Sequence, residues 1–114
     1  MDSKQFGRMK RGKLAPEARI DLHGMTQDQA YPELIRFILT AQENGCRLVL
    51  VITGKGRTKA EDGPIPVRLG VLKRQVPGWL RQAPLGAVVQ QVVDAHQRHG
   101  GEGALYVYLR RRNL

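Results

Sequence analysis

At 114 residues, with 41% hydrophobic and 25% charged side chains, the chain has the size and composition of one globular domain, which excludes general disorder. It carries 19 Lys and Arg against 10 Asp and Glu, and the resulting net charge of +9 favours nucleic acid, ahead of a membrane surface, as partner. A single cysteine excludes an internal disulfide, and no apolar run approaches the ~18 residues of a membrane span. These features predict a soluble, cytoplasmic protein.

The positive charge is unevenly distributed along the chain. Residues 21–46 hold one basic and four acidic side chains, whereas the segments on both sides of them are basic. Residues 1–18 show no sustained hydrophobic period and are predicted to form a flexible basic N-terminal arm. The domain itself is predicted over residues 19–114.

The first predicted elements are a strand and a helix. Arg19–His23 alternates apolar and polar residues, which places Asp21 and His23 together on the polar face of a half-buried strand. Thr26 and Gln29 form a capping-box signal for a helix that ends near Gly45. Pro32 either kinks that helix or marks its beginning.

A continuous apolar run at Arg47–Thr53 predicts a central strand covered on both faces. A 13-residue loop, Gly54–Pro66, follows it and contains Lys55, Arg57 and Lys59. Loops of this length are more often functional than the usual short connections.

The second half of the chain predicts one helix and two strands. The helix starts at Pro66, and Pro77 is expected to end or bend it. The valine-rich Ala87–Ala95 is expected to be a strand that joins a last strand, Ala104–Arg111, through the glycine-rich turn His99–Gly103. Along the last strand, Tyr106, Tyr108 and Arg110 share one face.

These elements predict an α/β two-layer sandwich with the order β-α-β-α-β-β. Its mixed four-stranded sheet is expected to have the first three strands parallel and the last antiparallel, with the helices packed on it. The ends of the strands then bring four segments to one edge: Asp21–Gly24, Thr53–Gly56, the basic loop and His99–Gly103. Ligands of open α/β sheets bind at such edges, and the N-terminus of the first helix adds backbone donors for a phosphate.

Two of these segments contain residues suited to phosphate chemistry. Glycines at Gly54-Lys55-Gly56 allow backbone amides to approach a phosphate, although a plain turn is an equally good interpretation. His23 beside Asp21 is a candidate general acid or base, although such pairs are more often structural.

Several motifs together resemble the Smr (small MutS-related) domain family. Ile20–Gly24 (IDLHG) looks like its L-D-x-H-G motif, Thr53–Gly56 (TGKG) looks like its T-G-x-G motif, and residues 70–80 and 99–107 resemble its later helix and final strand. The similarity runs from about residue 17 to residue 111 and is greatest to the stand-alone bacterial branch. It implies a two-layer α/β sandwich, DNA or RNA binding and, as in several members, nicking endonuclease activity.

The resulting prediction is an endonuclease that nicks DNA or structured RNA. Asp21 and His23 would be catalytic, with Asp21 either orienting His23 or binding Mg²⁺ or Mn²⁺, and no organic cofactor is expected. The nucleic-acid-binding set is Gly24, Thr53, Gly54, Lys55, Gly56, Arg57, Lys59, His99, Gly100, Gly101, Tyr106, Tyr108 and Arg110. The alternative is a non-catalytic module that binds DNA, RNA or the ribosome, with bases stacked on the two tyrosines. A pure protein-interaction domain is disfavoured by the charge.

Overall fold

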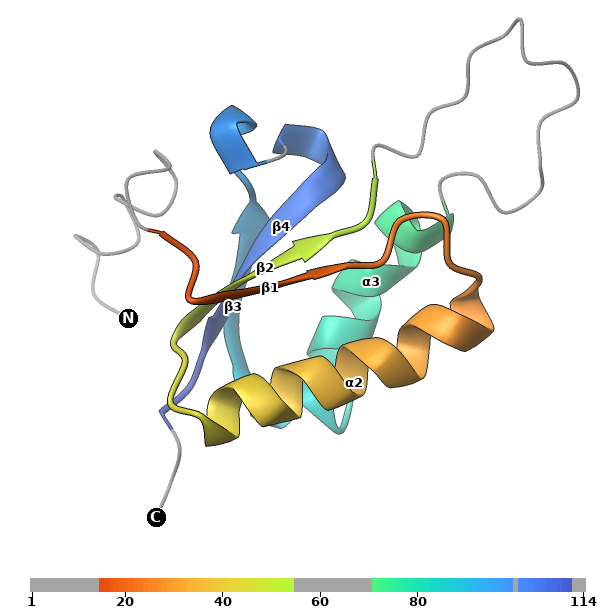
Figure 1. The fold of residues 1–114 in the computed structure, drawn as a ribbon. Helices are drawn as coiled ribbons and strands as arrows, with labels where there is room; N and C mark the ends of the chain where they lie inside the picture. Colours follow the sequence, from red (N-terminus) through yellow and green to blue (C-terminus); the bar gives the residue numbers. More distant parts are fainter. Residues whose placement is uncertain (1–14, 55–70, 100, 112–114) are drawn as a thin grey trace, which may run out of the picture.

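The computed structural model describes residues 15–54, 71–99 and 101–111. In chain order the main elements are β1 (Ala18–Asp21), α2 (Gln27–Glu43), β2 (Leu48–Ile52), α3 (Val71–Arg81), β3 (Val89–Asp94) and β4 (Ala104–Leu109). Three short 3-10 turns, η2 (Leu85–Ala87), η3 (Gln97–His99) and η4 (Gly101–Gly103), precede β3 and β4. Figure 1 shows both α-helices on one side of the four-stranded sheet, which confirms the predicted α/β fold with a mixed sheet.

The strand order is β1-β2-β4-β3, and this order corrects the expected pairing. β1 and β2 pair in parallel, but β4 lies between β2 and β3 and pairs antiparallel with both. Of the first three strands, which we expected to be parallel, only β1 and β2 form a parallel pair in the described sheet. Two successive antiparallel pairings leave β3 pointing in the direction of β2, so Asp21, Ile52 and Asp94 end their strands at the edge where β4 begins.

A capping box starts α2, and each of the two helices continues through an internal proline. Thr26 and Gln29 form the capping box, each side chain bonded to the backbone N–H of the other. Pro32 does not start α2, because the helix begins at Gln27 and continues through it, nor does Pro77 end α3, which runs on to Arg81. Each proline lacks one N–H donor, a cost that the packing of the helix can offset.

The core lies between the sheet and the helices. Leu34, Ile38, Leu72, Val76 and Leu80 of the helices meet one face of the sheet, and all five are buried. Burying a side chain of this size contributes roughly 1.5–3 kcal/mol each, enough to hold the helical layer in place. The predicted faces of β4 are confirmed: Val107 and Leu109 join this core, whereas Tyr106 and Tyr108 belong to a second cluster on the other face.

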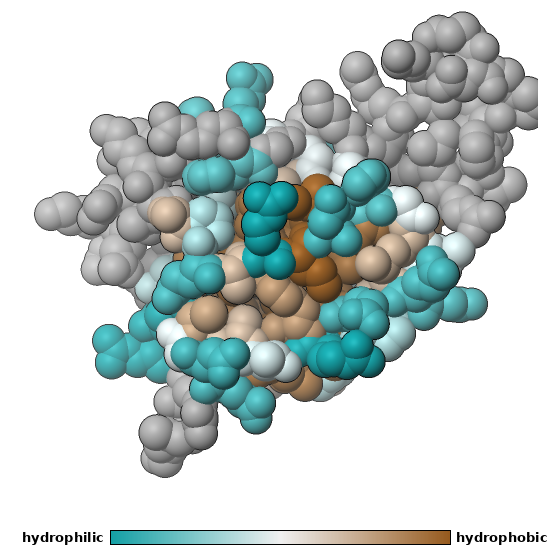
Figure 2. All heavy atoms as spheres, viewed as in Figure 1, coloured by the Kyte–Doolittle hydropathy of each residue, from teal (hydrophilic) through white to brown (hydrophobic). Residues whose placement is uncertain are grey.

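β1 is an edge strand, and a groove runs between it and α2. The groove has a volume of about 380 Å³ and is lined on its apolar side by Ala18, Ile20, Phe37, Ala41 and Cys46. Figure 2 shows apolar side chains gathered there, with polar residues around them. Arg19 and Asp21 alternate with these lining residues and lie on the opposite face of the strand.

Among the described residues, no helix is long and apolar enough to cross a bilayer.

Candidate functional site

The site is built at the end of β1, where the chain turns into α2. Leu22 is fully buried, and its N–H donates to the carbonyl of Ile52, so the β1–β2 ladder continues one residue past the strand. Gly24 then adopts a φ of +84°, a left-handed conformation that glycine adopts without steric cost, and the N–H of Met25 donates to the carbonyl of Leu22. A buried leucine between two exposed polar residues thus fixes Asp21 and His23 on the surface.

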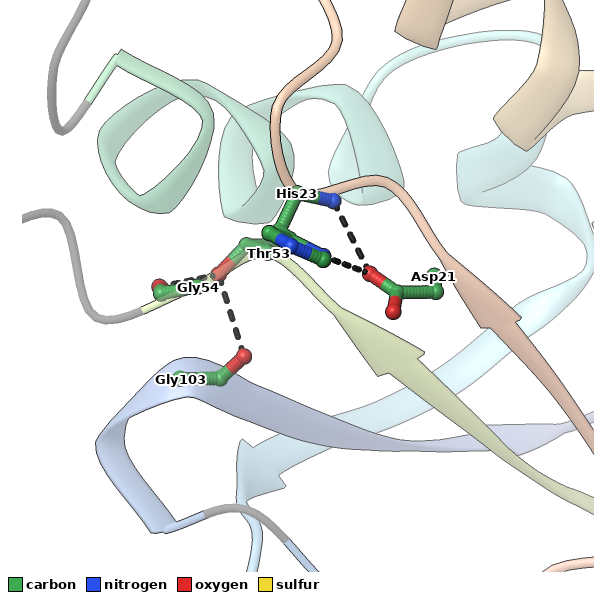
Figure 3. Close-up of polar contacts among 5 residues, drawn as sticks. All are labelled: Asp21, His23, Thr53, Gly54 and Gly103. Carbon is green, nitrogen blue, oxygen red and sulfur yellow. Dashed lines mark hydrogen bonds and ion pairs between the residues drawn. The ribbon is translucent and has the colours of Figure 1, made fainter.

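Asp21 and His23 form a bonded pair. One carboxylate oxygen, Oδ1 of Asp21, accepts from the backbone N–H of His23 at 3.0 Å and lies 2.7 Å from Nδ1 of its ring (Figure 3). The side-chain hydrogen bond from His23 holds the pKa of the Asp21 carboxyl below its usual range. Partial burial raises this pKa, and the hydrogen bond from the backbone N–H of His23 lowers it further. Asp21 is therefore an ionised acceptor at neutral pH, which assigns the Nδ1 proton to His23.

This tautomer leaves the Nε2 atom of a neutral His23 as the proton acceptor of the pair. The side chains of His23 and Asp21 are 67% and 46% exposed, so a substrate atom can reach the ring. A histidine oriented by a carboxylate and open to solvent is the arrangement used for general acid–base chemistry.

The end of β2 is fixed by the loop before β4. The carbonyl of Gly103 accepts from the N–H groups of both Thr53 and Gly54, at 2.8 and 3.0 Å. The Thr53 hydroxyl donates to the carbonyl of Gly54 at 3.0 Å and also lies 3.5 Å from the carbonyl oxygen of Gly103 (Figure 3). The Gly54 amide is thus not the free donor that we expected of a phosphate cradle. Lys55, Gly56, Arg57 and Lys59, which complete the predicted basic loop, lie outside the described residues, as does Gly100.

Gly54 also touches the Asp21–His23 pair directly. Its φ is +84°, and a Cβ atom built on it would lie 3.3 Å from the Cβ atom of His23. The structure therefore brings the two principal motifs together, as the sequence predicted. The role of Gly103 was missed, and the available signal was its place in the glycine-rich turn expected at the same edge.

His99 lies in η3, at the end of the sheet where β4 begins. Its Nδ1 atom is hydrogen-bonded to the hydroxyl of Tyr106, and the two rings meet edge to face at a centroid distance of 5.5 Å. Tyr106 is fully buried. Gly101 follows in η4 with a φ of +54°, and its N–H donates to the carbonyl of His96. The turn expected to be flexible is therefore two hydrogen-bonded 3-10 turns in its described part.

The predicted base-stacking surface is wrong, because the structure buries both tyrosines. Tyr108 is 4% exposed, and the guanidinium of Arg47 lies over its ring at 4.9 Å while also donating to its hydroxyl. Arg110 follows the far end of β4, away from Asp21 and His23, so the strand places it at the opposite end of the sheet. Alternation along β4 groups these three residues correctly but does not show that the face is covered.

The described residues do not fit a metal centre by themselves. Within them, no group of three His, Cys, Asp or Glu side chains gathers to bind a cation, and Oδ1 of Asp21 is already bonded to His23. Mg²⁺ and Mn²⁺ require several oxygen ligands. The N-terminus of α2 is also less suited to a phosphate than expected, because its capping box engages the amides of Thr26 and Gln29 and Asp28 adds a negative charge.

Comparison with known proteins places this geometry in context. The Smr domain matches residues 20–110. The chain is 33% identical over 105 residues to the ribosome rescue factor SmrB of Aeromonas hydrophila, covering 92% of this chain and 52% of that protein. It is 31% identical over 106 residues to the SmrB of Haemophilus influenzae, covering 93% and 54%. The chain thus spans about half the length of the curated relatives it matches.

Two solved structures share the fold. The crystal structure of YdaL, a stand-alone small MutS-related protein from Escherichia coli, superposes with a TM-score of 0.73 and 26% identity over 97% of this chain and 78% of that one. The Smr domain of Thermus thermophilus MutS2 superposes with a TM-score of 0.64 and 26% identity over 82% of this chain and 98% of that one. Each superposition thus covers more than four fifths of this chain.

Proposed function

The chain belongs to the Smr domain family, and from that premise we propose that it is a nucleic-acid-binding module that acts on RNA at the ribosome. The observation that carries the proposal is the net charge of +9 on a chain of 114 residues. Contacts between basic side chains and phosphates supply most of the affinity of such proteins. Because two relatives are named ribosome rescue factors, ribosome-bound RNA is the first partner to test. Binding to ribosomes would place the protein in the cytoplasm.

A second candidate function, cleavage of the bound strand, is favoured by the Asp21–His23 pair. In RNA, Nε2 of His23 would take the proton of a 2′-hydroxyl, whose oxygen then attacks the adjacent phosphorus. The 5′-oxygen leaves and takes a proton from water, and His23 gives its proton to the hydroxide that remains, so the products are a 2′,3′-cyclic phosphate and a 5′-hydroxyl. Asp21 would hold the ring and stabilise its charge after proton transfer, as the carboxylate does in other such pairs.

Nicking of DNA would require water as the nucleophile, because DNA lacks the 2′-hydroxyl. The predicted Mg²⁺ or Mn²⁺ has no ligand set within the described residues, and the proton transfer through His23 that we propose does not itself require one. Activity that persists in EDTA and acts on RNA would agree with this route.

Both candidates are tested with the purified chain on structured RNA, ribosomes and supercoiled plasmid, each with Mg²⁺, Mn²⁺ or EDTA. We expect RNA affinity to fall steeply as salt increases. If cleavage occurs, His23→Ala should reduce its rate about 10²–10⁴-fold and leave affinity nearly unchanged. His96→Ala, which removes another exposed histidine, should change neither the rate nor the affinity.

The outcomes separate the two candidates. RNA binding without cleavage supports the binding module alone. Loss of binding in proportion to activity in both His23→Ala and Asp21→Asn makes the pair a phosphate-binding element and contradicts a catalytic role. Cleavage at the wild-type rate by both variants also contradicts that role, and affinity that does not change with salt contradicts the binding proposal.

A further inference from the structure

Arg19 is placed beside the candidate site by the pleat of β1. It lies two residues before Asp21 on the same face of the strand, and successive residues on one face are about 6.6 Å apart. Its neighbour across the ladder is Leu50, as Ile52 is the neighbour of Asp21. Ala18 and Ile20, the alternate residues, pack against the core, which directs Arg19 away from it.

The Arg19 side chain is exposed on an edge strand. β1 pairs with β2 on one side, and no strand of the described sheet pairs with its other side. Among the described residues, Arg19 makes no hydrogen bond or ion pair, in contrast to Arg36, which pairs with Glu33 at 2.9 Å, and to Arg47, which lies on Tyr108. Its charge nevertheless reaches the site, since it contributes to lowering the pKa of the Asp21 carboxyl.

A cation so placed is suited to the backbone of a bound RNA strand. The guanidinium group presents several N–H donors in a fixed plane and binds phosphate with two parallel hydrogen bonds. The separation of Arg19 and Asp21 along β1 is similar to the separation of neighbouring phosphates on an extended strand. Because the ring of His23 is bonded to Asp21 at 2.7 Å, a strand with one phosphate at His23 that extends along β1 would bring another phosphate to Arg19.

We infer that Arg19 binds a second phosphate of the strand held at His23, and that single-stranded RNA runs along the exposed face of β1. This inference rests on the proposed function, because it names a second contact of the same site and the direction in which the RNA extends. The path follows β1 away from His23 toward Ala18. It differs from the path expected from sequence, in which the RNA lay over Tyr106 and Tyr108.

The inference is tested by measuring the affinity of single-stranded RNA oligonucleotides over a series of salt concentrations, for the wild-type chain and three variants. Arg19→Ala should weaken binding about tenfold and reduce the slope of log K against log salt by about 0.7, the contribution of one phosphate contact on a single strand. Arg19→Lys should restore the slope but only part of the affinity, because lysine keeps the charge and loses the planar group.

Arg74→Ala is the matched control, because it removes the same charge from an exposed position on α3, which lies in the helical layer. It should leave the slope unchanged. If Arg19→Ala and Arg74→Ala have equal effects, or if Arg19→Ala keeps the wild-type slope, the inference is overturned while the proposed function stands. If the wild-type chain itself shows no salt-dependent affinity for RNA, the proposed function fails and this inference fails with it. Urea unfolding of each variant checks that the fold is retained.

Discussion

His23 and Gly54 touch through atoms close to the backbone: a Cβ atom added to Gly54 would lie 3.3 Å from the Cβ of His23. The turn after β1 and the end of β2 are therefore packed against each other at the point where the two motifs meet. A side chain at position 54 would have to displace the histidine or the strand end. This contact leads to the first prediction.

We expect Gly54→Ala to destabilise the fold by about 1–2 kcal/mol, because its φ of +84° disfavours any residue with a Cβ atom. It should also shift the ring resonances of His23 in NMR spectra. Gly78→Ala is the matched control, since Gly78 lies inside α3 with no atom within 4 Å of an added Cβ. This control should stabilise the protein by about 0.5–1 kcal/mol. Equal stability of both variants in urea would contradict the strain at Gly54.

The second prediction concerns acid unfolding. The pKa of the Asp21 carboxyl is lowered in the folded chain, so Asp21 stabilises the fold above the ordinary carboxyl pKa of about 3.9, and this contribution is lost as pH falls through the lower folded value. The difference in unfolding free energy between the wild type and Asp21→Asn should therefore be larger at pH 6 than at pH 2. In the His23→Ala background the pH dependence of this difference should shrink, because the principal hydrogen bond is gone. A difference that does not change with pH would show that the pair has no energetic effect.

The third prediction separates the N-terminal residues into a binding part and a structural part. Glu17 belongs to the fold: its carboxylate accepts from the N–H groups of Arg47 and Leu48, and its own N–H donates to the carbonyl of Leu48. Deleting residues 1–14 should weaken RNA binding, because five basic residues are lost, and leave stability unchanged. Deleting residues 1–18 should also destabilise the protein by at least about 1–2 kcal/mol.

Glu17→Ala in the full chain is the control for the second deletion. It should reproduce part of the loss of stability in a urea titration without changing affinity for RNA. If the shorter deletion already unfolds the protein, residues 1–14 are part of the folded domain. That result would contradict the predicted basic arm.

Local signals in the sequence predicted the neighbourhood of the site. Alternation at Ile20 and Leu22, the capping pair at Thr26 and Gln29, and the apolar run of β2 each depend on residues close in the chain. Because β1 and β2 are joined by a helix, their parallel pairing follows from the handedness of such connections. These rules were sufficient to place Asp21 and His23 beside Gly54.

The remaining features depend on contacts between distant residues. A short glycine-rich turn predicts that β3 and β4 pair, but whether β4 then pairs with β2 is decided by packing of the whole sheet. The period of two along β4 groups Tyr106 with Tyr108 without showing that Arg47 and His99 engage them. Nor does the sequence reveal that the Gly54 amide, which was expected to bind phosphate, donates instead to the carbonyl of Gly103, 49 residues later.

The register of β1 against β2 has a consequence for how this site can vary. Asp21 lies opposite Ile52, and a shift of one residue would turn Asp21 and Arg19 toward α2 and bring Ile20 to the surface. Such a shift would bury two charges and remove the acceptor from His23 in a single step. The alignment that turns Ile20 and Leu22 toward the core is thus the same alignment that assembles the site. A substitution of either residue that weakens the pairing of β1 with β2 should therefore reduce RNA binding before it unfolds the chain.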